Sequence, residues 1–170
     1  MKLFSTISLK IAAIFSSTIF LKIAVIFIGT PVLALCILGL PWLANNPVNP
    51  DYAHILYPIL VGIYASAIPF YIALYKAFRL LSYIDKNKAF SQISVKALKN
   101  IKYCAITIST LFVVMMPFVY LIAEKDDAPG LIIVGMIPIF ASMVISVFAA
   151  VLQRLLEEAI DIKSENDLTV

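Results

Sequence analysis

The chain has 170 residues, of which 62% are hydrophobic and only 14% are charged, and its net charge is +3. Soluble domains contain roughly 45–50% apolar and about 25% charged residues, so this composition excludes an ordinary soluble fold. We therefore expect a membrane protein, in which the placement of the few charges carries most of the information.

Four stretches without Asp, Glu, Lys or Arg are long enough to cross a bilayer. A hydrocarbon layer of about 30 Å needs about 20 helical residues at ~1.5 Å each. The stretches cover residues 23–43, 55–75, 103–123 and 131–152, and each contains proline. They predict an all-α fold: a four-helix transmembrane bundle with proline-kinked spans, forming a single membrane domain over residues 23–152.

Lysine and arginine are segregated along the chain. Twelve of the thirteen lie before the first span, in the connection 76–102, or in the tail 153–170, and only Lys125 lies in the other two connections. The positive-inside rule then predicts that both termini and the connection 76–102 are cytoplasmic.

The leader formed by residues 1–22 contains a local duplication. Residues 5–15 recur as residues 17–27 with nine of eleven positions identical. Lys10 interrupts the apolar core that a signal peptide needs, so we expect an uncleaved extension. Two arrangements stay open: an amphipathic helix on the inner membrane surface, and a first helix that extends into the cytoplasm.

Residues that could catalyse a reaction or bind a metal are scarce in the predicted spans. Carriers and proton-coupled pumps usually keep a charged residue inside the bilayer, and these spans have none. The single histidine, His54, lies at the edge of a span, where we expect a solvated residue rather than a metal ligand. Cys36 and Cys104 lie at depths that differ by roughly 15 Å, which is too far for a disulfide. We expect no catalytic site, no metal and no cofactor.

The connection 76–102 is the most distinctive polar segment. Residues 85–88 are expected to form a polar turn, followed by a basic amphipathic helix with Phe90, Ile93, Ala97, Leu98 and Ile101 on one side. The candidate contacts with a partner or with anionic lipid head groups are Lys86, Lys88, Phe90, Lys96, Lys99 and Lys102. No recognised nucleic-acid motif accompanies these cations, so we do not expect direct nucleic-acid binding.

The tail is expected to continue the fourth helix as far as Lys163. Its apolar stripe consists of Leu155, Leu156, Ala159 and Ile162, and Glu157, Glu158 and Asp161 are expected to approach the basic connection. The pattern breaks at Ser164. The last candidate contacts are Glu165, Asn166, Asp167 and Leu168, because peptide-binding domains can capture a free apolar C-terminus.

Small residues at four-residue spacing occur in two of the spans. Gly62 with Ser66, and Ser142 with Ser146 and Ala150, offer faces where helices can approach closely. Packing within one chain is the preferred interpretation, and homo-oligomerisation stays open.

Several motifs resemble one family of membrane proteins. They are the runs 29–36, 84–91, 97–102 and 165–170. Together they resemble the YoaS-like family of small four-span bacterial membrane proteins over roughly residues 17–170, although the duplicated leader departs from its pattern. The resemblance implies a multi-pass protein of the bacterial cytoplasmic (inner) membrane and brings no activity, ligand or cofactor. Family members are often encoded beside a small helix-turn-helix regulator, which implies a regulatory partner.

The leading hypothesis is a non-enzymatic accessory or regulatory component in the lipid bilayer. Its connection 76–102 and its tail would engage a cytoplasmic partner such as a small helix-turn-helix regulator. The alternative is a small transporter or an immunity protein against a membrane-active toxin, using the bundle as a path or binding surface. An enzyme ranks last, because no constellation of acid, base and nucleophile is present.

Overall fold

The computed structural model describes residues 2–46, 53–85 and 90–168, and it describes side chains at 18–46, 54–85 and 90–166. These residues form helices and short turns, with no strand among them. Four of the helical segments are long and apolar enough to cross a membrane. The predicted all-α fold with four transmembrane helices is therefore confirmed.

The helical elements contain the predicted spans in full. Their bounds are Lys2–Ala34 for α1, Leu35–Gly39 for the π-helical turn η1, Leu40–Asn45 for α2, Ala53–Asp85 for α3, Gln92–Lys125 for α4 and Gly130–Leu168 for α5. The elements α1, η1 and α2 follow one another without a break. Because α1 begins at Lys2, its backbone favours the second arrangement of the leader, an extension of the first helix.

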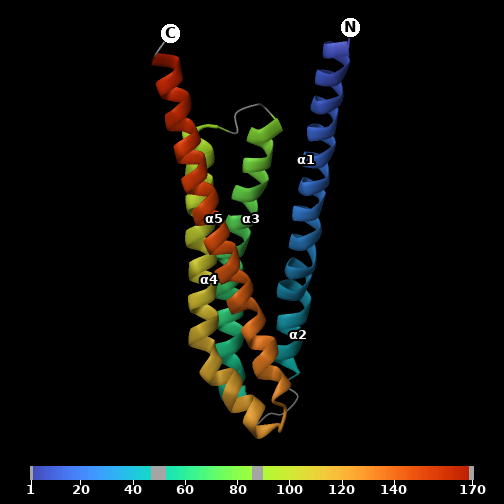
Figure 1. Ribbon diagram of the computed structural model, residues 1–170. Coiled ribbons are helices and arrows are strands. Elements are labelled where there is room, and N and C mark those ends of the chain that lie inside the picture. Colours follow the sequence, from blue (N-terminus) through green and yellow to red (C-terminus); the bar gives the residue numbers. More distant parts are fainter. Residues whose placement is uncertain (1, 47–52, 86–89, 169–170) are drawn as a thin grey trace.

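The bundle has two unlike ends (Figure 1). Both chain termini lie at one end, which we call the terminal end, and the turn from α4 to α5 lies at the other, which we call the loop end. α4 packs along both α3 and α5, whereas α1 packs mainly on α3. The packed core is therefore a unit of three helices, and α1 is attached to one side of it.

Glycine allows two of the closest helix contacts in this core. A methyl group at Gly62 of α3 would overlap the sulfur of Met115 in α4. At Gly135 of α5, it would lie 3.1 Å from the sulfur of Met116. Since Met115 is buried, the bulk of each methionine fills the space that the facing glycine leaves.

One predicted local feature is wrong: Asp85 is the last residue of α3 rather than part of a turn. α5 continues to Leu168, past Ser164, where the apolar pattern of the tail breaks. The polar run 164–167 lowers helix propensity, but it contains neither glycine nor proline, so nothing in it forces the helix to end.

The basic amphipathic helix before the third span begins at Gln92, and its predicted apolar face is only partly correct. Ala97 and Leu98 are buried, and Ile101 is half-buried. Phe90 and Ile93 are exposed. The reason is that Ala97 and Leu98 share a face with Ser94, which is fully buried, whereas Ile93 lies at the edge of this face.

Candidate functional site

Cations mark one level of the bundle near the terminal end. The Nζ atom of Lys102 in α4 donates to Oε1 of Gln153 in α5 at 3.1 Å, beside Arg154. The Nζ atom of Lys22 in α1 lies 5.8 Å from the ring centre of Phe78 in α3. Together with Lys76, which precedes Phe78 by two residues, these contacts define the cation level: Lys22, Lys76, Lys102 and Arg154.

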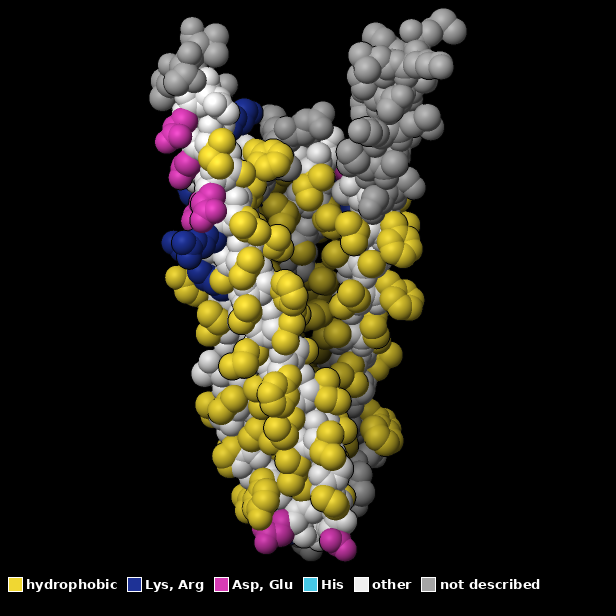
Figure 2. Space-filling model, in the orientation of Figure 1, with side chains coloured by type: hydrophobic (Ala, Val, Ile, Leu, Met, Phe, Trp, Pro, Cys, Tyr) yellow, Lys and Arg dark blue, Asp and Glu magenta, His cyan; other side chains and the backbone are white. Residues whose placement is uncertain are grey.

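Helix segments beyond the cation level form what we call the terminal extension. α5 continues for fourteen residues after Arg154, which corresponds to about 20 Å. Acidic and basic side chains lie along this part of α5, acidic side chains recur at the loop end, and hydrophobic side chains cover the surface between them (Figure 2). This distribution is typical of a bundle that crosses the hydrocarbon layer and enters water at both ends.

The first turns of α4, with Phe90 two residues before its start, present an apolar and basic surface in the terminal extension. Phe90 is 62% exposed and Ile93 is 56% exposed. Lys96 and Lys99 are exposed on the same segment. We call these four residues the α4 face.

Other candidate contacts are dispersed. Lys86 and Lys88 lie outside the described residues. Lys102 is half-buried and bonded to Gln153, so it joins two helices rather than facing a partner. Glu165 and Asn166 are exposed on α5. Asp167 and Leu168 belong to the same helix, and their side chains lie outside the described ones.

Two acids of the tail bond within their own helix. Glu157 accepts a hydrogen bond from Gln153 at 3.0 Å, and Glu158 pairs with Arg154 at 3.1 Å. These bonds leave the approach of the acids to the basic connection as a prediction, although Gln153 bonds to both Lys102 and Glu157. Arg154 and Glu158 are well exposed, and such pairs contribute only about 0–1 kcal/mol.

An ion pair that the sequence analysis missed joins α1 to α3. The Nζ atom of Lys22 bonds to Oδ2 of Asp85, and the side chains of Lys22 and Asp85 are only 24% and 13% exposed. The two residues are 63 positions apart. One feature of the sequence could have indicated this pair: Asp85 is an acidic residue among the cations that the predicted topology places on the cytoplasmic side.

Two tyrosines extend this attachment into the membrane. The hydroxyl of Tyr71 donates to the carbonyl oxygen of Gly29 at 2.9 Å, and that of Tyr64 donates to the carbonyl oxygen of Cys36 at 2.8 Å. Donors and acceptors are each seven residues apart, as expected for antiparallel helices packed along one face. Cys36 lies in η1, where a π-helical turn disturbs the regular helical bonding and makes a carbonyl available.

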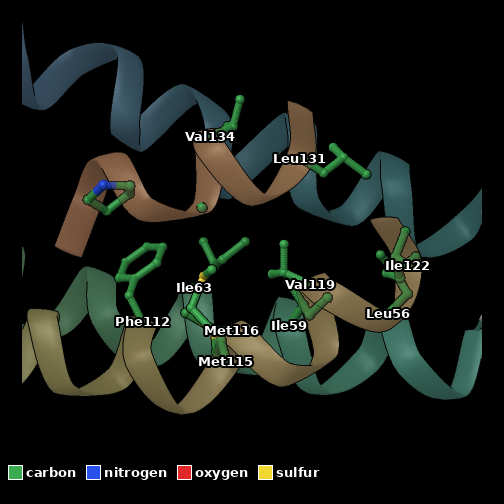
Figure 3. Close-up of a pocket in the computed structure, with 12 residues that line it drawn as sticks. Leu56, Ile59, Ile63, Phe112, Met115, Met116, Val119, Ile122, Leu131 and Val134 are labelled. Atoms are coloured by element: carbon green, nitrogen blue, oxygen red, sulfur yellow. The ribbon is translucent and has the colours of Figure 1, made fainter. Parts of the chain in front are cut away.

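An apolar cavity of about 380 Å³ lies among α3, α4 and α5 toward the loop end (Figure 3). All of its lining residues are apolar: Leu56, Ile59, Ile63, Phe112, Met115, Met116, Val119, Ile122, Leu131, Val134, Gly135 and Pro138. A cavity with this lining suits an apolar group and offers no side-chain hydrogen bond to a polar one.

Comparison with known proteins identifies the family. The family model described as a protein of unknown function, DUF2975, matches residues 42–170. The chain is 65% identical to "Uncharacterized membrane protein YoaS" of Bacillus subtilis (strain 168) over 172 residues, covering all of both chains. No solved structure matches the chain. The predicted resemblance is confirmed: this multi-pass membrane protein belongs to the DUF2975 family.

Proposed function

We propose that the protein is a non-enzymatic component of the bacterial cytoplasmic membrane that binds a cytoplasmic regulatory protein at its terminal end. The cytoplasmic orientation of this end is supported by twelve of the thirteen Lys and Arg residues. The partner we propose is a small helix-turn-helix regulator, the kind of protein often encoded beside members of the YoaS-like family.

The α4 face is the observation that carries this proposal. It carries two large, exposed apolar side chains, Phe90 and Ile93, beyond the cation level. Exposed apolar groups bordered by polar ones mark interaction surfaces. Lys96 and Lys99 would attract an acidic partner, and they would also attract anionic lipid head groups at about 1 kcal/mol each.

Photocrosslinking in living cells tests the proposal. A photoreactive residue at Ile93 should capture one specific cytoplasmic protein, and the double variant Lys96→Glu/Lys99→Glu should abolish the capture. A photoreactive residue at Val114, which is exposed within the apolar span of α4, serves as the control. Capture of lipid alone at Ile93, or of the same protein at Val114, would contradict the proposal.

The cavity supports a second candidate, an immunity protein against a membrane-active toxin. Its apolar lining would accept an apolar side chain of such a peptide, and it gives no support to a path for polar solutes. The variant Val119→Phe should fill the cavity and raise sensitivity to the toxin, whereas Val114→Phe and the α4-face variant should not. Equal sensitivity of all three variants would exclude this role for the cavity.

A further inference from the structure

α5 carries apolar residues on two sides in the terminal extension. Leu156 and Ile160 are half-buried. Leu155 is 56% exposed and Ile162 is 61% exposed. Because Ile162 lies eight residues past Arg154, about 12 Å beyond the cation level, water rather than lipid surrounds it. A second apolar side in water indicates a surface that another helix covers.

The exposed side has the spacing of a coiled coil. Leu152, Leu155, Ala159, Ile162 and Asn166 follow one another at intervals of three and four residues. They fill alternating a and d positions of a heptad, in which Leu155 and Ile162 occupy d. We call these five residues the α5 stripe. The same spacing continues into the membrane through Phe148 and Ile145, which are also exposed.

Charges beside the α5 stripe match a parallel pair of identical helices. In this heptad Glu158 occupies position g and Lys163 occupies position e, and both are exposed. In a parallel dimer, a g residue faces the e residue five positions later in the partner helix, so Glu158 of each copy would face Lys163 of the other. Asn166 occupies an a position, where a polar residue favours one register.

The packing of the other helices leaves this side of α5 accessible to a second copy of the protein. α1 packs mainly on α3 rather than on α5, and α5 lies at the front of the bundle with hydrophobic side chains along its face (Figures 1 and 2). Two copies inserted in the same orientation have parallel α5 helices, related by a twofold axis along the membrane normal.

We propose that the protein forms a parallel homodimer through the α5 stripe, with Glu158 of each copy paired to Lys163 of the other. This pairing goes beyond the proposed function and is separate from it, because the α4 face lies on a different helix. Glu158 would exchange its exposed bond with Arg154 of its own helix for the contact between copies.

Disulfide crosslinking in native membranes tests the register. With Cys36 and Cys104 replaced by alanine, Leu155→Cys and Ile162→Cys should each form disulfide-linked dimers several-fold more efficiently than Ser164→Cys. Ser164 is the matched control because it is exposed, lies two residues from Ile162 and occupies position f. Equal crosslinking at all three positions, or crosslinking of Ile162→Cys to a different protein, would overturn the proposal.

Charge reversal tests the pairing by a second measurement. Glu158→Lys should lower the dimer fraction several-fold in single-molecule photobleaching of vesicle-reconstituted protein, and the double variant Glu158→Lys/Lys163→Glu should restore it. The lost bond to Arg154 is not restored in the double variant, so recovery reports the contact between copies. A monomeric wild-type protein, or no recovery in the double variant, would refute the dimer. Photocrosslinking at Ile93 reports the cytoplasmic partner independently.

Discussion

Side-chain bonds hold α1 to the core at successive levels. Lys22 of the cation level pairs with Asp85, and Tyr71 and Tyr64 bond to backbone carbonyls within the apolar region. Hydrogen bonds between helices in membranes average about 0.6 kcal/mol. Since α1 packs mainly on α3 within the described part of the chain, each of these bonds matters for its attachment.

Removing a tyrosine hydroxyl should weaken this attachment without changing its packing. We expect Tyr71→Phe and Tyr64→Phe each to lower the free energy of unfolding by about 0.6 kcal/mol, with an upper bound near 1.7 kcal/mol. Reversible unfolding in mixed micelles measures the change. Tyr120→Phe, at an exposed tyrosine of α4, is the control, and equal losses in all three variants would show that the two bonds contribute nothing specific.

Exchanging the charges of the ion pair tests the position of α1. The single variant Lys22→Asp places two carboxylates together and should move α1 away from α3, whereas Lys22→Asp/Asp85→Lys should return it. Spin labels at Ile19 and Ser82 report the separation between α1 and α3. An unchanged label distance in the single variant would mean that the ion pair does not hold α1.

At the scale of elements, the uncharged stretches predicted the four membrane helices, because length and hydropathy are local properties. The contacts between helices could not be predicted from the sequence, because they depend on how the helices are placed against one another. The contact between Tyr64 and Cys36 can be predicted only from the register between α1 and α3. The π-helical turn η1 shifts that register. The two apolar sides of α5 could not be told apart from the sequence, because the side of the tail that α4 covers depends on packing between helices.

Glycine at position 62 should be essential for the contact between α3 and α4. Gly62→Ala removes an unfavourable glycine, worth about 1 kcal/mol, but overpacks the site against Met115, which costs about 1–3 kcal/mol. We expect a net loss of unfolding free energy of up to about 2 kcal/mol. Gly130→Ala is the control, because a methyl group there meets nothing within 4 Å. Met115→Ala should relieve the loss, and a stable Gly62→Ala protein would refute the close contact.

On the scale of the whole molecule, the two ends have different chemistry. The terminal end combines the cation level with the long extension of α5, whereas the loop end is short and carries the exposed acids Glu124, Asp126 and Asp127. The α4 face and all of the α5 stripe except Leu152 lie in the terminal extension. The proposed partner and the proposed second copy would therefore meet the protein on the same side of the membrane.

Orientation decides whether these surfaces face the cytoplasm. In a background without Cys36 and Cys104, a membrane-impermeant thiol reagent should label Asp127→Cys in intact cells and label Ser164→Cys only after the membrane is opened. Both positions are exposed in the bundle, so a difference in labelling reports the side of the membrane rather than burial. The expected result follows from the cations, because cytoplasmic segments retain Lys and Arg. Labelling of Ser164→Cys in intact cells would place the terminal extension outside and exclude a cytoplasmic partner.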